Sequence, residues 1–203
     1  MKNFFIIIII LILTNLSSCS FLEEGPLDRL VVSNFYSSAK DAQSAVDATY
    51  QQLGSIYLRP IYMLTELTTD NLKNGIGMPN AFLQNLEYLR LDPENTFIKG
   101  IWSNCYSGIS RANSAINNIP DVTMDATLKS RLIAEARFLR ALFYFNLVRF
   151  FGDVPLIKDL ESVEDALGPR NPKEEVYQLI IDDLIFAESN LPLRSEYGSK
   201  EEG

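Results

Sequence analysis

The sequence predicts a mostly α-helical protein. Hydrophobic residues recur at three- and four-residue spacing through most of the chain, and no segment shows the two-residue alternation that is typical of a half-buried strand. The chain has 203 residues, of which 47% are hydrophobic and 22% are charged. This composition is that of a globular protein with one domain, or two small ones, around a buried core.

Residues 1–18 are expected to form an export signal that is removed from the mature protein. Lys2 precedes an unbroken apolar run over residues 4–13, and small residues follow the run. A membrane-spanning helix needs about 20 apolar residues, so this run is too short to span. The order of positive charge, apolar run and small residues is instead that of a signal peptide. A buried helix of a cytosolic core is the alternative, but it leaves Lys2 unexplained.

The tetrapeptide Leu-Ser-Ser-Cys at residues 16–19 is similar to a bacterial lipobox. In that motif the cysteine thiol accepts a diacylglycerol, and the cysteine becomes the mature N-terminus. We therefore expect lipidation at Cys19, where two or three acyl chains would anchor the protein firmly to a membrane. The other cysteine, Cys105, lies among apolar residues with helical spacing and is expected to be a small core residue.

Residues 19–38 are expected to form a lipidated tether and an extended lead-in. Glu23 and Glu24 follow the lipidated cysteine closely. Acidic residues at this position resemble the surface-export signal of Bacteroidetes lipoproteins, although a solvated linker would have the same composition.

An α-helical domain is expected over residues 39–203. The apolar spacing predicts helices over 38–54, 61–69, 97–119, about 128 to a stop at Gly152, and 171–191, with a loop-rich segment over 71–93. In the helix that stops at Gly152, one apolar stripe is expected, and four further apolar residues are expected to widen it. The stripe is Leu132, Ala136, Leu139, Phe143, Leu147 and Phe150, and the four are Leu128, Phe138, Leu142 and Phe145. For the last helix, Asn171 is the expected N-cap and Pro172 lies in the first turn. Its apolar residues Val176, Ile180 and Leu184 are expected to be partly uncovered, because no following helix is present to pack on them.

The helices suggest an irregular tetratricopeptide-like helical repeat. Ala134, Phe138 and Ala141 reproduce the Ala-x₃-Phe-x₂-Ala part of a tetratricopeptide second helix. The match is loose, because Trp102 lies too far upstream and Pro155 too far downstream for the standard repeat. Residues 172–191 are then the first helix of a second, incomplete pair.

Composition excludes several classes of function. The chain has 18 basic and 26 acidic residues, for a net charge of −8, so nucleic acid is not an expected partner. It has no histidine, which excludes histidine-based catalytic triads and histidine-ligated metal sites. The acidic pairs at 174–175, 182–183 and 201–202 are adjacent, so on a helix they point in different directions and do not suit glycoside hydrolysis. We therefore expect no enzyme, no metal site and no cofactor.

Residues 134–156 resemble the SusD/RagB family of nutrient-binding lipoproteins of Bacteroidetes outer membranes. The segment reads Ala-Glu-Ala-Arg-Phe-Leu-Arg-Ala-Leu-Phe-Tyr-Phe at 134–145 and ends in Phe-Phe-Gly-Asp-Val-Pro-Leu at 150–156. Supporting matches lie at 101–106, 111–113, 175–177, 183–184 and 190–192. The resemblance extends from Leu16 to about Tyr197.

The resemblance implies the N-terminal part of a SusD-like fold and a binding role in place of catalysis. It implies a lipid-anchored, surface-exposed protein of the cell outer membrane that captures an oligosaccharide, a polysaccharide or another nutrient. Its partner would be a SusC-like TonB-dependent transporter. Because family members are much longer, the chain is expected to be a fragment that is incomplete at its C-terminus. The alternatives are a helical-repeat lipoprotein scaffold that binds protein partners, or a non-functional gene fragment.

The sequence assigns no ligand-binding residue, but it offers candidates. Trp102 is the single tryptophan, and aromatic rings stack on sugars, yet its apolar neighbours favour core packing. The segment 71–93 is where ligand contacts are expected. Three tyrosines are as compatible with a sugar-binding surface as with packing: Tyr57, Tyr62 and Tyr88.

Charged residues in the segment 134–156 are expected to be structural. Arg137 and Arg140 are predicted to form partly buried salt bridges that hold helices together, in preference to contacting a substrate. Arg131 and Glu135 are four residues apart and are expected to form an ordinary helical ion pair.

Overall fold

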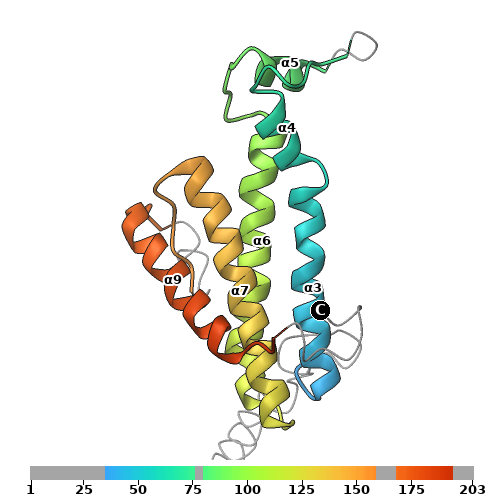
Figure 1. Ribbon diagram of the computed structural model, residues 1–203, viewed down its shortest axis with the longest axis vertical. Helices are drawn as coiled ribbons and strands as arrows, with labels where there is room; N and C mark the ends of the chain where they lie inside the picture. The colour runs from blue at the N-terminus through green and yellow to red at the C-terminus, as the bar shows by residue number, and fades with distance from the viewer. Residues whose placement is uncertain (1–34, 76–79, 159–167, 194–203) are drawn as a thin grey trace, which may run out of the picture. The chain divides into compact units, whose positions relative to one another are not determined.

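The computed structural model describes residues 35–75, 80–158 and 168–193 (Figure 1). Its contacts divide the chain into two units, Met1–Phe35 and Tyr36–Gly203, and the helices described below lie in the second. The predicted signal peptide and Cys19 lie outside the described residues.

Four long helices run alternately up and down in the second unit (Figure 1). They are α3 (Ala39–Tyr57), α6 (Thr96–Asn118), α7 (Ala126–Phe151) and α9 (Lys173–Asn190). The short helices α4 (Pro60–Glu66) and α5 (Ala81–Glu87) lie at the upper end in Figure 1, and a 3₁₀ turn, η1 (Ile119–Asp121), connects α6 to α7. None of the described residues form a strand. The mostly α-helical fold is therefore confirmed.

Helix α3 begins where the sequence predicts and ends later. The Ser38 side chain is the N-cap: its hydroxyl accepts a hydrogen bond from the backbone N–H of Asp41 at 3.3 Å. The predicted end at Gly54 is wrong, because the helix continues to Tyr57. Glycine in a helix costs about 1 kcal/mol relative to alanine, and the complete burial of Ile56 offsets that cost here.

Helices α6 and α7 form the centre of the core. Ile101, Ile109, Leu139, Phe143 and Leu147 are at most 1% exposed. Leu139, Phe143 and Leu147 belong to the predicted apolar stripe of α7 and confirm it, and Leu132 and Ala136 of the same stripe are also buried.

The residues expected to widen this stripe are less buried than the stripe itself. Phe138 and Phe145 are each 38% exposed, and Leu128 and Leu142 are partly exposed. The predicted stop at Gly152 is confirmed: this residue has a φ of +68° and follows the last helical residue.

Part of the segment predicted to be loop-rich, 71–93, is the helix α5. The Asn80 side-chain oxygen accepts hydrogen bonds from the backbone N–H groups of Phe82 and Leu83, at 3.0 and 3.2 Å. Leu86 is completely buried and fixes the helix to the rest of the unit. Seven residues are too few for a hydrophobic period to be recognised in the sequence.

Asn171 is not the N-cap of α9, contrary to prediction. The helix is preceded by Pro172, and Asn171 instead pairs with the chain that follows α7. Its backbone N–H donates to the Val154 carbonyl at 3.0 Å, and its side-chain oxygen accepts from the Leu156 N–H at 3.0 Å. The Asn171 amide is therefore used to hold residues 154–156 in place.

The expected exposure of α9 is only partly correct. Val176 and Ile180 are 0% and 4% exposed because they face α7, whereas Leu184 is 41% exposed. No described helix is long and apolar enough to cross a membrane.

Candidate functional site

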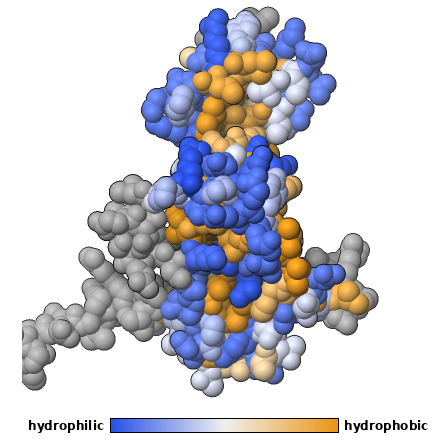
Figure 2. Space-filling view, turned by 90° about the vertical axis from the view of Figure 1, so that its left-hand side faces the viewer, coloured by the Kyte–Doolittle hydropathy of each residue, from blue (hydrophilic) through white to orange (hydrophobic). Residues whose placement is uncertain are grey.

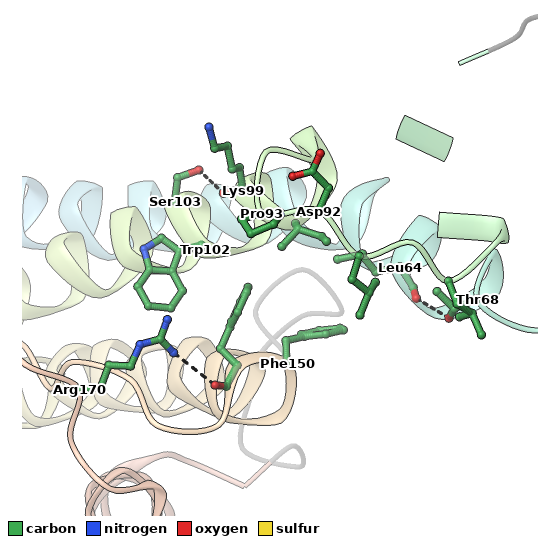
Figure 3. Close-up of a pocket in the computed structure, with 13 residues that line it drawn as sticks. Leu64, Thr68, Asp92, Pro93, Lys99, Trp102, Ser103, Phe150 and Arg170 are labelled. Carbon is green, nitrogen blue, oxygen red and sulfur yellow. Dashed lines mark hydrogen bonds between the residues drawn. The ribbon is translucent and has the colours of Figure 1, made fainter. Parts of the chain in front are cut away.

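A hollow of about 920 Å³ opens between the ends of α4, α6 and α7. It is called the α6–α7 hollow below. Figure 3 shows side chains from these helices pointing into one space. The hollow is lined by Leu64, Thr68, Leu89, Leu91, Asp92, Pro93, Ile98, Lys99, Trp102, Ser103, Phe150, Phe151 and Arg170.

Trp102 forms one wall of the hollow and also packs on the core. Its ring centroid lies 5.0 Å from that of Tyr106 and 5.0 Å from that of Phe151, which it meets edge to face. The prediction that Trp102 packs against the core is therefore confirmed, but the same side chain also faces the hollow.

Arg170 closes the hollow from the segment before α9. Its guanidinium carbon lies 5.3 Å from the Trp102 ring centroid, a cation–π geometry. One of its nitrogens donates to the backbone carbonyl of Asp153 at 2.9 Å. Figure 3 shows the guanidinium directed toward the indole. A positive charge is thus fixed beside the tryptophan.

The polar groups of the hollow lie mainly on α6 and on the turn before it. Lys99 pairs with Glu94, and both side chains are more than half exposed. Asp92 accepts a hydrogen bond from the backbone N–H of Glu94 at 2.9 Å, which shapes the turn. The lining therefore combines an apolar and aromatic wall with a charged rim.

A second, smaller hollow of about 280 Å³ shares Trp102 and Ser103 with the first. Its other lining residues are Tyr106, Ile109, Ser110, Pro155 and Ile157. The Tyr106 hydroxyl donates to the Pro155 carbonyl at 2.9 Å. Burial, and to a lesser degree the neighbouring Tyr144, raise the pKa of Tyr106, so this hydroxyl keeps its proton and remains a donor.

Further along α6 and α7 from the first hollow, a buried ionic network joins three helices. Arg140 of α7 donates two hydrogen bonds to the carboxylate of Asp183 of α9, at 2.7 and 2.8 Å, and one to Asn113 of α6 at 2.8 Å. Arg137 lies 4.0 Å from Asp183 and stacks over Phe186. The prediction that both arginines hold helices together is confirmed. The predicted Arg131–Glu135 ion pair is also present, at 2.7 Å.

The other candidates from the sequence lie in three places: the lining of the hollow, the exposed surface and the core. Tyr57, Tyr62 and Tyr88 are exposed, at 41%, 47% and 58%. The end of segment 71–93 lines the hollow through residues 89 and 91–93, whereas Tyr57, Tyr62 and Tyr88 do not. Cys105 is buried, as predicted. The sequence does not indicate Phe150, Phe151 or Arg170 as site residues. The only sequence signal for the two phenylalanines is that they form an aromatic pair at the end of a long helix, and Arg170 has no such signal.

Comparison with known proteins identifies the family. A family model described as "Starch-binding associating with outer membrane", of the SusD-like type, matches residues 20–201. The chain belongs to the SusD-like family. The SusD-like protein P2 of Formosa agariphila is 32% identical over 95% of this chain and 39% of its own length. The chain thus spans about two fifths of the length of this SusD-like relative.

Solved structures of SusD-like proteins have the same fold over most of this chain. A laminarin-binding SusD-like protein matches with a TM-score of 0.70 and 28% identity, over 80% of this chain and 37% of the other. A crystal structure with xylogluco-oligosaccharide matches with a TM-score of 0.64 and 28% identity, over 78% and 31%. SusD-like proteins are binding proteins and not enzymes, which agrees with the prediction from the sequence.

Proposed function

We propose that this chain is part of a SusD-like lipoprotein that binds a glycan at the cell surface, with the α6–α7 hollow as part of the contact surface. The observation that carries the proposal is the placement of Trp102 in the wall of a hollow of about 920 Å³ with a charged rim. A sugar ring has apolar C–H faces and hydroxyl edges. An aromatic wall with polar groups around it suits both.

The hollow is tested by titrating the full chain with laminarin and with xylogluco-oligosaccharide, the ligands of two structural relatives. Trp102 is the only tryptophan, so its fluorescence reports on this site alone. We expect a saturable change in emission. Leu91→Asp places a charge on the lining and is expected to weaken binding about tenfold or more, because the charge would have to be desolvated.

The matched control is Leu58→Asp. Leu58 and Leu91 are both largely exposed, at 85% and 68%, but only Leu91 lines the hollow. The control should bind as the unmodified chain does. A different result is binding that calorimetry detects without any change in the tryptophan emission, and with Leu91→Asp binding as tightly as the unmodified chain. That result would show that the glycan binds outside the hollow. A lack of binding across a broad glycan panel would contradict the proposed function itself.

We also propose that residues 1–18 are a lipoprotein signal peptide, that residues 19–38 are a lipidated tether, and that residues 39–203 are the helical domain. Cys19 would carry the lipid that anchors the protein to the outer membrane, exposed at the surface, beside a SusC-like TonB-dependent transporter. Two observations support this: the lipobox-like tetrapeptide at 16–19, and the description of the matching family as associating with the outer membrane.

The anchor is tested by metabolic labelling with an alkyne fatty acid in a bacterial host that processes lipoproteins. Cys19→Ser is expected to abolish the label and release the protein from membranes, because the thiol is the acceptor. Cys105→Ala should keep the label, since Cys105 is buried in the core. Label retained by Cys19→Ser would contradict the proposal. Co-purification with an outer-membrane transporter after mild crosslinking tests the partner.

A further inference from the structure

Leu89 has a backbone conformation that favours glycine. Its φ is +54°, and the only other positive φ among the described residues belongs to a glycine, Gly152, at +68°. In the left-handed region the Cβ atom comes too close to the following carbonyl oxygen, so a residue with a side chain is less stable there. Leu89 is therefore a strained residue.

The end of α5 imposes this conformation. The Leu89 N–H donates to the Leu86 carbonyl at 3.0 Å, and the Arg90 N–H donates to the Asn85 carbonyl at 2.7 Å. These two bonds form the Schellman motif, in which the residue after the helix is left-handed and is usually glycine. Because Leu86 is completely buried, the end of the helix is fixed in place.

The chain that follows Leu89 is fixed as well. Asn95, the N-cap of α6, is completely buried. Its side-chain amide donates to the Phe82 carbonyl of α5 at 2.9 Å, and its side-chain oxygen accepts from the Phe97 N–H at 3.0 Å. Leu89 therefore lies in a short connection between two helices that are tied to each other.

Packing within the described part of the chain does not compensate for the strain. Leu89 is 65% exposed, so most of its apolar surface stays in contact with water. It lines the α6–α7 hollow together with Leu91 and Trp102. Figure 2 shows hydrophobic surface at the upper end of the molecule, where α4 and α5 lie in Figure 1. Strained residues cluster at ligand-binding sites, where a fixed side-chain position is useful.

We propose that Leu89 is a ligand-contacting residue of the α6–α7 hollow, and that its strained backbone places its aliphatic side chain against the apolar C–H face of a bound sugar. This inference rests on the proposed function, because it requires the hollow to bind a glycan. Glycine would suit the backbone but would offer no contact. The free chain thus loses some stability in order to hold the contact ready before the ligand arrives.

The test measures stability and affinity in one variant of the full chain. Leu89→Gly removes the strain and the contact together. Its urea midpoint should rise by about 0.3 M, although glycine also makes the unfolded chain more flexible. Its affinity for laminarin or xylogluco-oligosaccharide, measured by calorimetry, should fall about fivefold or more, because the apolar contact is lost. Damage to the fold does not explain weaker binding by a more stable chain.

Leu91→Gly is the matched control for the strain. Leu91 also lines the hollow and is similarly exposed, at 68%, but its φ is not positive. Loss of its side chain should weaken binding without raising the urea midpoint. Leu89→Met keeps both the strain and an apolar side chain, so its affinity should stay within about threefold of that of the unmodified chain. Leu58→Ala, at an exposed position outside the hollow, should change the affinity by less than about twofold.

Two results would overturn the inference and leave the proposed function intact. One is a raised midpoint in Leu89→Gly with unchanged glycan affinity, which would show that the strained leucine does not contact the ligand. The other is a midpoint that does not rise, or that rises equally in Leu91→Gly, which would show that no strain is released at position 89. A lack of glycan binding by the unmodified chain would instead contradict the proposed function, and this contact with it.

Discussion

Asp183 is the single side chain on which the packing of α9 depends most. It is 1% exposed and accepts two hydrogen bonds from Arg140, which is itself 7% exposed. Asp183→Ala leaves the buried guanidinium without its counter-ion, so we expect the free energy of unfolding to fall by about 3–5 kcal/mol. Asp182→Ala is the neighbouring control, on the exposed side, and should change it by less than about 0.5 kcal/mol. Urea denaturation followed by circular dichroism measures both.

Gly108 is a second residue at which the addition of one carbon atom is expected to change the stability of the fold. A methyl group there would lie 2.5 Å from the Phe143 ring, because α6 and α7 approach closely at this point. Gly108→Ala should therefore lower the free energy of unfolding by about 1–3 kcal/mol through overpacking. Gly100→Ala, in the same helix, meets nothing closer than 4.0 Å. It should instead stabilise by up to about 1 kcal/mol. Equal effects of the two substitutions would contradict the close approach.

At the scale of elements, side chains of α6 and α7 hold the segment between α7 and α9. The Tyr144 hydroxyl accepts from the Ile157 N–H at 2.8 Å and donates to the Ile157 carbonyl at 3.1 Å. Tyr144→Phe removes both bonds and should lower the free energy of unfolding by about 1–3 kcal/mol. Hydrogen exchange of the Ile157 amide should also become faster. Tyr177→Phe, at an exposed position, should change neither, and unchanged exchange in Tyr144→Phe would contradict the role of this hydroxyl.

The long helices could be predicted from the sequence, and the short contacts between them could not. Helix α3 has a serine N-cap and α7 has a glycine stop, and both signals act within a few residues of the chain. Asn171 also has the sequence signal of an N-cap. Its backbone N–H and side-chain oxygen instead form hydrogen bonds with the backbone of Val154 and Leu156. Those bonds exist only after α7 and α9 have packed, so local sequence does not reveal them.

At the scale of the whole molecule, stability should depend on pH in the alkaline range. Burial raises the pKa of Tyr144 from 10.0 to about 12 and that of Cys105 from 9.0 to about 12. Between these values the unfolded chain has lost protons that the folded chain keeps. Folding stability is thus complete below about pH 9 and falls as the pH rises toward about 12, with each group contributing about 1.4 kcal/mol per pH unit within its window.

The check is the urea midpoint measured from about pH 8 to about pH 11. Tyr144→Phe should reduce the slope above about pH 10, because it removes one of the shifted groups. Tyr177→Phe is again the control and should leave the slope unchanged. A urea midpoint that stays constant over this range would contradict the raised pKa values of Tyr144 and Cys105 in the folded chain.

The candidate site is also a property of the whole unit. Trp102 and the end of segment 71–93 could be proposed from the sequence, because a lone tryptophan and a long loop are visible there. Their partners Phe150, Phe151 and Arg170 lie at least 48 residues further along the chain than Trp102. They converge only where the ends of α6 and α7 meet the segment before α9, and this convergence depends on the fold and not on any local pattern.

The Arg140–Asp183 pair also determines how far α9 can slide along α7. A shift of one helical turn would bring Leu179 or Ala187 opposite Arg140 and would leave two buried charges apart. Apolar surfaces alone tolerate such sliding, whereas this ion pair permits one register. The positions along the bundle of the exposed side chains of α9 are therefore set from the inside. Tyr177, Ile181, Leu184 and Ile185 each lie at one fixed level relative to α7.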